Sequence, residues 1–334
     1  MITKTRIVRT RTLDPWWNLA VEEYLLERVE KGECILYLWQ NQNTVVIGKN
    51  QNPWKECRTE LLECEKGKLA RRLSGGGAVF HDTGNLNFTF LVDKAEYNLE
   101  KQVRVILEAV KSLGIDAEMT GRNDITADGR KFSGNAFCFK KHSAYHHGTV
   151  LVEADMDKMT RYLQVSAEKI RSKGIESVRS RVVNLSEFKP SLTIDEMADA
   201  LAAAFTRLYG GEGVLEENLG PMDSDTLDEL YSKYSSWDWR YGEAPQFDVD
   251  FDTRFPWGGI QIGLQLDKGT ITKASVYSDA LDEEFISMMP EALNGCIFNT
   301  AKLAEAVRGM QKSCSEDRRQ MVEDIAGWLE SKAL

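Results

Sequence analysis

The spacing of apolar residues along the chain predicts alternating helices and strands. An apolar stripe predicts a helix from Asp14 to Val29, because an Asp-Pro pair at its start supplies an N-cap and a residue tolerated in the first turn. Two runs rich in β-branched and aromatic residues, Cys34 to Trp39 and Thr44 to Ile47, predict strands that pair with each other. Residues 98–113 have the helical period, and Gly114 follows as a C-cap.

A tight hairpin is predicted in the next segment. Asp128-Gly129 supplies the positive φ angles of a type I′ turn between a first arm at Ile125-Thr126 and a second arm from Lys131 to Phe139. Beyond the hairpin, the pattern predicts a strand at 149–152 and helices at 155–163, 193–208 and 226–234.

The pattern changes near residue 245. Phe247, Val249 and Phe251 alternate with aspartates, as in a half-buried strand. Two more strands at 260–266 and 271–277 and three helices at 283–293, 300–310 and 316–329 complete a small α+β unit. We therefore expect an α+β protein of two domains, residues 1–245 and 246–334.

Composition and charge narrow the class of protein. The chain has 334 residues, 42% of them hydrophobic and 28% charged, which is typical of a globular protein. Its net charge of −10 argues against non-specific nucleic-acid binding, and no apolar run is long enough for a membrane span. The six cysteines form no CxxC pair, so we expect reduced thiols in a cytoplasmic protein.

The charge is divided unevenly along the chain. Residues 1–189 hold 30 Lys and Arg against 25 Asp and Glu, whereas residues 190–334 hold 12 against 27. The first part could attract an anionic ligand or an acidic partner. The acidic second part is equally well explained as a solvated, solubilising surface.

The segment Arg71-Arg72-Leu73-Ser74-Gly75-Gly76-Gly77 is the most distinctive local sequence. Consecutive glycines let several backbone N–H groups approach one anion, and the arginines can donate forked hydrogen bonds to a carboxylate or phosphate. Neither GxxxxGK[ST] nor GxGxxG occurs, so P-loop and Rossmann sites are not supported. A flexible glycine turn remains the plainer interpretation.

The predicted hairpin carries a second candidate site. Asp124 precedes its first arm and Lys131 begins its second, so the turn brings the two side chains together. Asp124 could bind the Mg²⁺ ion of a nucleotide, and Lys131 could neutralise charge on a transferring group. An exposed hairpin with a solvated lysine is the alternative.

Other chemically active residue types give weaker indications. His142, His146 and His147 lack metal-site spacing, so they either pack in a strand or donate a hydrogen bond to a ligand. Cys138 lies between phenylalanines and is expected to be a buried, inert thiol. We expect the following tryptophans in the core: Trp16, Trp17, Trp39, Trp54, Trp237 and Trp239.

Six blocks of sequence, in order, resemble lipoate-protein ligase A. They are Asp14 to Glu23, Val45 to Pro53, Arg71 to Asp82, Gly121 to Asp124, Arg130 to Gly134 and His146 to Thr149. Residues 173–185 extend the resemblance, and the C-terminal domain matches by size and position.

The resemblance implies a fold of the biotin/lipoate ligase type, with mixed β-sheets and surrounding helices, plus a small C-terminal accessory domain. It also implies an activity. The lipoate carboxylate attacks the α-phosphate of MgATP, and the resulting lipoyl-AMP passes its acyl group to a lysine of an acceptor domain. The implied acceptors are acidic apo lipoyl domains of 2-oxo acid dehydrogenase complexes and the glycine-cleavage H protein.

The resemblance also implies site residues. Lys131 matches the family's essential lysine, which lies beside the carboxylate and α-phosphate. Asp124 matches a position near the nucleotide and its Mg²⁺ ion. The lipoate- and adenylate-binding positions are Arg71, Arg72, Ser74, Gly75, Gly76, Gly77, Ala78, Val79, Asn123, Ser133, Gly134, His147, Thr149, Arg179 and Arg181.

Two alternatives remain open at this point. One is an ATP-independent octanoyl or lipoyl transferase that forms a thioester on Cys138, and the other is a non-catalytic lipoyl-binding homologue. The sequence does not identify the base for the acceptor lysine, and it does not decide between lipoate and octanoate.

Overall fold

The computed structural model describes residues 2–120, 124–164, 182–211, 215–216, 224–241, 249–267, 269–313 and 315–332. These residues form two compact units. The larger unit comprises the described residues within Met1–Ile47, Pro53–Arg72 and Ala78–Arg240. The smaller unit comprises those within Gly48–Asn52, Leu73–Gly77 and Tyr241–Leu334.

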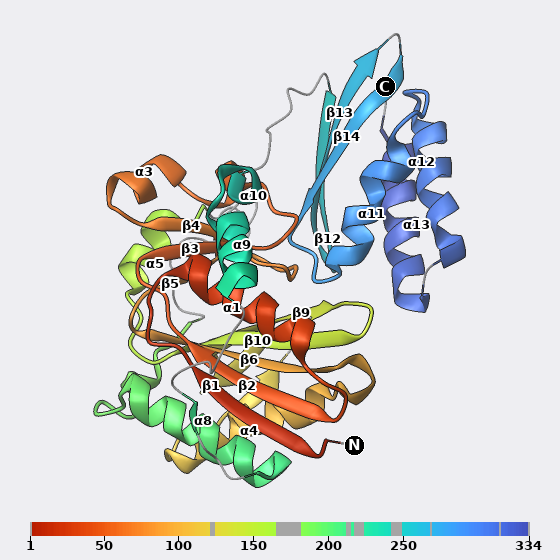
Figure 1. Cartoon of the computed structure of the whole chain (residues 1–334). Helices are drawn as coiled ribbons and strands as arrows, with labels where there is room; N and C mark the ends of the chain where they lie inside the picture. Colours follow the sequence, from red (N-terminus) through yellow and green to blue (C-terminus); the bar gives the residue numbers. More distant parts are fainter. Residues whose placement is uncertain are drawn as a thin grey trace. The chain divides into compact units, whose positions relative to one another are not determined.

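A mixed sheet organises the larger unit, and Figure 1 labels its strands β1, β2, β6, β10 and β9. The full eight-stranded order is β11-β1-β2-β6-β10-β9-β8-β7. β1 runs parallel to β2 and β11, and the other neighbours are antiparallel. The strands are β1 (Lys4–Arg9), β2 (Glu33–Trp39), β6 (Asn85–Asp93), β7 (Glu118–Thr120), β8 (Asp124–Ala127), β9 (Arg130–Phe139), β10 (Ser143–Leu151) and β11 (Leu215–Glu216).

Helices cover the two faces of this sheet. α4 (Leu99–Ser112) and α8 (Ile194–Tyr209) pack on one face and enclose the main hydrophobic core of the unit (Figure 1). α1 (Pro15–Arg28) contacts β6 and β10, with α9 (Ser224–Ser235) packed against it. Asp14 accepts a hydrogen bond from the Trp16 N–H group at the start of α1, as its sequence predicts.

The prediction that Cys34 to Trp39 pairs with Thr44 to Ile47 is wrong. β3 (Thr44–Ile47) lies between β4 (Lys68–Arg71) and β5 (Val79–His81) in a separate three-stranded sheet, whereas β2 joins the large sheet. Every residue of β2 and β3 is buried. Buried strands need hydrogen-bond partners along both edges, which a two-stranded hairpin does not supply. β2 finds these partners in β1 and β6, and β3 finds them in β4 and β5.

The predicted hairpin is confirmed. Asp128 and Gly129 have φ angles of 50° and 69°, as a type I′ turn requires, and they join β8 to β9. The predicted C-cap is also present, because Gly114 has a φ angle of 85° just after α4. The other helices among the described residues of this unit are α2 (Pro53–Glu56), α3 (Thr59–Cys64), η1 (Lys94–Glu96), α5 (Met156–Tyr162), η2 (Leu185–Glu187) and α10 (Trp237–Tyr241), whose last residue is grouped with the smaller unit.

The smaller unit contains an antiparallel sheet in the order β12-β13-β14 and its own hydrophobic core. Its elements are β12 (Val249–Phe255), β13 (Gly258–Asp267), β14 (Thr270–Ser278), α11 (Glu283–Leu293), α12 (Thr300–Gly309), η3 (Met310–Ser313) and α13 (Glu316–Glu330). The three strands and three α-helices agree with the sequence pattern, except that Phe247 lies outside the described residues.

The tryptophans are more exposed than the sequence predicts. Trp39 is buried, whereas Trp16, Trp17 and Trp239 are half-buried, and Trp54 and Trp237 are 40% and 51% exposed. The prediction that all six tryptophans lie in the core is therefore confirmed only for Trp39. Among the described helices, we find none with the length and apolar character required to cross a membrane.

Candidate active site

Lys131 and Asp124 form an ion pair at one edge of the candidate site. The Nζ atom of Lys131 lies 2.7 Å from Oδ1 of Asp124, and the two side chains are 35% and 41% exposed. The β8–β9 hairpin creates this proximity, as the sequence predicts. A register shift between Ile125 and Thr126 places Lys131 opposite Thr126 while Gly134 faces Asp124.

The missing side chain of Gly134 leaves room for Lys131. A Cβ atom at Gly134 would lie 3.0 Å from Nζ and 3.1 Å from Cε of Lys131. The Gly134 N–H group donates to Oγ1 of Thr149 at 3.2 Å. Lys131, Asp124, Gly134 and Thr149 therefore lie together on one face of the sheet.

A row of side chains continues from this group across the sheet. Thr149 on β10 is opposite Asn87 on β6, and Asn87 is opposite Trp39 on β2. Because residues opposite one another on neighbouring strands share a face, these side chains extend from the Lys131 end toward Trp39. Asn87 is 1% exposed and Trp39 is 3% exposed, so the row enters the interior.

His147 belongs to the next row along the strands, which is also buried. It is opposite Thr89 on β6. Glu22 of α1 lies beneath both residues, and its Oε1 atom accepts from Thr89 Oγ1 at 2.7 Å and is 2.8 Å from His147 Nδ1. The buried carboxylate therefore holds the Nδ1 proton of His147 and orients the ring.

Arg71 and Arg72 lie at the end of β4 and make protein contacts. Arg71 donates through Nε to the Trp239 carbonyl at 2.8 Å and through an Nη atom to the Arg240 carbonyl at 2.9 Å. Arg72 is 5% exposed and donates to the Val46 carbonyl at 3.2 Å. Burial lowers the pKa of Arg72 to about 10, so this guanidinium remains a buried cation near pH 7.

The glycine loop, Ser74 to Gly77, belongs to the smaller unit. The Gly76 N–H group donates to the Ala280 carbonyl at 3.0 Å, and a Cβ atom at Gly75 would lie 2.3 Å from the same oxygen. The Ser74 carbonyl accepts from the Lys49 N–H group at 2.9 Å. The structure therefore groups Ser74 to Gly77 with β14 and α11 of that unit.

The other predicted site residues are distributed as follows. Ala78 and Val79 lead into β5 in the larger unit. Ser133 is opposite Ile125 of the core enclosed by α4 and α8, so it does not share the face of Lys131. Asn123, Arg179 and Arg181 lie outside the described residues.

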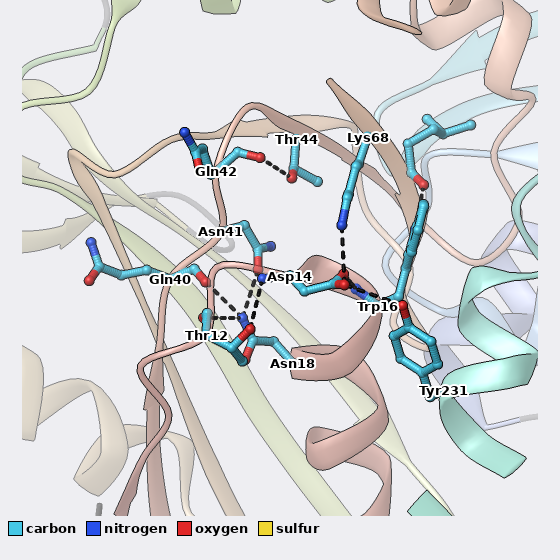
Figure 2. Close-up of polar contacts among 11 residues, drawn as sticks. Thr12, Asp14, Trp16, Asn18, Gln40, Asn41, Gln42, Thr44, Lys68 and Tyr231 are labelled. Carbon is cyan, nitrogen blue, oxygen red and sulfur yellow. Dashed lines mark hydrogen bonds and ion pairs between the residues drawn. The ribbon is translucent and has the colours of Figure 1, made fainter. Parts of the chain in front are cut away.

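A buried hydrogen-bond network lies next to Trp39. Asn18 of α1 bonds to Asn41, and Asn41 in turn bonds to His81 on β5 (Figure 2 shows the Asn18–Asn41 part). The His81 ring centroid is 6.1 Å from that of Trp39, with the rings at 70°. Burial, with smaller contributions from Arg72 and His147, lowers the pKa of His81 to about 3.

Several of these residues are not among the predicted site residues: Glu22, Trp39, His81, Asn87 and Thr89. The available signal is in β6, where Asn85, Asn87 and Thr89 alternate with Leu86, Phe88 and Phe90. Such alternation normally marks one solvated face, yet only the last residue of β6 is not fully buried. Polar residues on a covered face need hydrogen-bond partners there, but burial of that face is visible only in the fold.

Comparison with known proteins identifies the class of this site. Residues 14–206 match the family of lipoyl protein ligase A/B catalytic domains, and residues 244–329 match the bacterial lipoate protein ligase C-terminus. The chain therefore belongs to the lipoate-protein ligase family and is an enzyme of that family. The predicted family and fold class are confirmed.

Solved structures of similar proteins include one complex with lipoate and one with ATP. P. falciparum LipL1, in complex with lipoate, is 27% identical over 99% of this chain and 100% of its own, with a TM-score of 0.85. A bipartite lipoate protein ligase from Thermoplasma acidophilum, analysed with its E2 lipoyl domain, is 26% identical over 75% of this chain and 100% of its own, with a TM-score of 0.65. A lipoate-protein ligase A bound with ATP is 25% identical over 72% of this chain and 99% of its own, with a TM-score of 0.61.

Proposed function

We propose that this protein is an ATP-dependent ligase that converts lipoate to lipoyl-AMP and transfers the lipoyl group to a lysine of a lipoyl domain. The observation that carries the proposal is the position of Lys131, whose ammonium group lies over Gly134 at the end of a buried polar row. Relatives whose structures hold lipoate or ATP support the choice of substrates.

Lys131 would act in both half-reactions. In the first, a lipoate oxygen attacks the α-phosphorus of ATP and pyrophosphate leaves. Two anions must then approach each other, and one fixed cation offsets their repulsion. In the second, the acceptor amine attacks the acyl carbon and AMP leaves, while the same cation stabilises the developing oxyanion.

Asp124 is suited to hold the Mg²⁺ ion that accompanies ATP. Mg²⁺ binds in such sites through one or two carboxylates together with phosphate oxygens. Asp124 supplies one partly exposed carboxylate beside Lys131, which fits that pattern. In the same proposal, Asn123, Arg179 and Arg181 contact the adenylate, as do Ala78 and Val79.

Thr149 and His147 would line the acyl chain. Thr149 adjoins Lys131 through Gly134, and His147 lies in the next row along the strands, with its ring held by Glu22. In this proposal, Arg71, Arg72 and the Ser74 to Gly77 loop contribute to binding the same acyl-adenylate.

The proposed acceptors are acidic lipoyl domains of 2-oxo acid dehydrogenase complexes and the glycine-cleavage H protein. The T. acidophilum relative was analysed with an E2 lipoyl domain, which supports the first of these. The excess of Lys and Arg in residues 1–189 supports an acidic partner. A cytoplasmic location remains part of the proposal.

A thioester mechanism on Cys138 receives no comparable support. Cys138 is 1% exposed in β9, opposite Tyr145. A nucleophilic thiol must be accessible to its substrate, and the Cys138 thiol is buried.

The experiment is acyl transfer to an apo lipoyl domain, followed by intact-protein mass spectrometry. We expect a lipoyl mass increase only when lipoate, ATP and Mg²⁺ are all present. Transfer from an acyl carrier without ATP would favour the transferase instead. Binding of lipoate without any mass increase would favour the non-catalytic homologue.

A further inference from the structure

The orientation of the Asn18 amide is fixed by its partners. Its Nδ2 atom donates to the carbonyl oxygens of Thr12 at 3.1 Å and Gln40 at 2.7 Å. Its Oδ1 atom accepts from the Thr10 hydroxyl at 2.9 Å. Carbonyl oxygens only accept hydrogen bonds, so the nitrogen of Asn18 must face them.

This orientation is passed on to Asn41 and His81. The two hydrogens of Asn18 Nδ2 are shared among three acceptors, the third being Oδ1 of Asn41 at 3.0 Å (Figure 2). This leaves Nδ2 of Asn41 facing Nδ1 of His81 at 3.1 Å. Nδ1 of His81 therefore accepts a hydrogen bond. A neutral imidazole with an acceptor at Nδ1 carries its proton on Nε2. The low pKa of His81 keeps the ring neutral near pH 7.

The Nε2–H group of His81 is a buried donor that lacks a protein acceptor. His81 is 3% exposed, and its Nε2 atom has no hydrogen-bond partner among the described residues. On β6, Asn85 Oδ1 and Asn87 Nδ2 are also buried and also have no hydrogen-bond partner among the described residues. Folded proteins seldom leave such groups unsatisfied, and His81 and Asn87 both adjoin Trp39. Their unpartnered atoms therefore indicate a position where a ligand binds.

The distance from Lys131 suggests which part of the ligand reaches His81. Gly134, Thr149 and Asn87 lie on three adjacent strands, so the row from the Lys131 end to Asn87 spans about 10 Å. An extended eight-carbon acyl chain is roughly as long. A carboxylate at Lys131 therefore places the far end of the chain beside Trp39 and His81.

We propose that the Nε2–H group of His81, held in this tautomer by Asn18 and Asn41, donates to the dithiolane ring of lipoate and selects lipoate over octanoate. This inference rests on the proposed function. Sulfur is a weak acceptor, but the methyl end of octanoate accepts nothing and leaves the donor unsatisfied.

The test compares lipoate with octanoate in His81 variants. In His81→Phe the ratio of kcat/KM for lipoate to that for octanoate should fall about tenfold, with the KM for ATP unchanged. His81→Gln can accept from Asn41 and donate at the same place, so it should keep most of the ratio. An unchanged ratio in His81→Phe, an equal fall in both variants, or a rise only in the KM for ATP would overturn the proposal.

A measurement on the unmodified protein does not depend on the folding of a variant or on turnover. In protein labelled with ¹⁵N-histidine, NMR should show the proton of His81 on Nε2, and this resonance should shift with lipoate but not with octanoate. A proton on Nδ1, or equal shifts with both acids, would contradict the inference. If calorimetry and NMR show selective lipoate binding while no adenylate forms, the proposed function fails and the recognition of lipoate stands.

Discussion

His81 and His146 are fully buried in the larger unit, and burial is the main reason that the pKa of each falls to about 3. His146 is surrounded by Phe88, Phe90 and Phe137, and its Nε2 atom lies 2.8 Å from Asn135 Oδ1. Both rings are neutral in the folded chain, whereas a histidine in the unfolded chain titrates near pH 6.5.

This difference makes the folded state sensitive to acid. Below about pH 6.5 the unfolded chain binds protons that the folded chain does not, so the free energy of unfolding falls as pH decreases toward 3. At pH 5 each buried histidine should account for a loss of about 2 kcal/mol relative to pH 7.5. In His146→Phe, urea denaturation should therefore show a pH-dependent loss that is smaller by this amount. An equal loss in both proteins would show that His146 is not buried in its neutral form.

Gly134 is the residue that allows the Lys131 side chain to cross β9. The Cβ atom introduced by Gly134→Ala would meet the flexible end of Lys131, so Nζ should move while the fold persists. We expect pyrophosphate release to fall about 10- to 100-fold, because small displacements of a charged group reduce catalysis strongly. Gly327→Ala in α13, where an added Cβ meets nothing within 4 Å, is the matched control and should keep full activity. Equal activity of the two variants would remove Gly134 from the account.

At the scale of elements, Arg71 joins β4 to α10. Its guanidinium donates to two carbonyl groups at the C-terminal end of α10, and Trp239 Nε1 donates back to the Arg71 carbonyl at 2.9 Å. A cation at this end of a helix satisfies carbonyl groups that lack partners within the helix. Arg71 therefore has a structural role in addition to the ligand contact proposed from its motif.

Loss of this connection should lower stability. We expect Arg71→Met to reduce the free energy of unfolding by about 2 kcal/mol, because charged donors would be lost from carbonyl groups that are partly buried. Arg104→Met removes an exposed ion pair with Glu108 and should change it by less than about 0.5 kcal/mol. Urea denaturation measures both. If Arg71→Met keeps full stability and raises only the KM for lipoate, the contacts of Arg71 with α10 contribute little to the free energy of unfolding.

Elements were predictable where local chemistry determines them. The helix at Asp14, the C-cap at Gly114 and the Asp128-Gly129 hairpin each follow from a capping group or a turn residue, and the hairpin also brings Asp124 to Lys131. The separation of β2 from β3 was not predictable, because their partners β6 and β4 are distant in sequence. The same is true of the polar row, since only the assembled sheet places Trp39 beside Asn87.

For the whole molecule, the domain boundary near residue 245 remains a prediction from the change of pattern. The assignment of Leu73–Gly77 to the smaller unit was not indicated, because it depends on contacts such as that of Gly76 with Ala280. A glycine loop read from sequence shows which backbone groups are accessible, but it does not show which partner engages them.

The charge division along the chain leads to a prediction about the acceptor. If the first part of the chain attracts an acidic lipoyl domain, kcat/KM for that domain should fall severalfold between low salt and about 0.5 M salt. Pyrophosphate release in the absence of acceptor should change much less, since both substrates are small and bind at close range. Parallel titrations with NaCl measure the two rates. An acceptor rate that is independent of salt would show that the excess of basic residues does not guide docking.

The most direct test of the central claim is lipoate-dependent pyrophosphate release, measured with MgATP and without acceptor, for the natural sequence and for Lys131→Met. The control is Lys140→Met, which changes an exposed lysine just beyond the other end of β9. We expect the natural sequence and the control to release pyrophosphate and form lipoyl-AMP, and Lys131→Met to lose at least about 100-fold in rate while remaining folded. Full activity of folded Lys131→Met would contradict the proposed role of this lysine in activating the carboxylate.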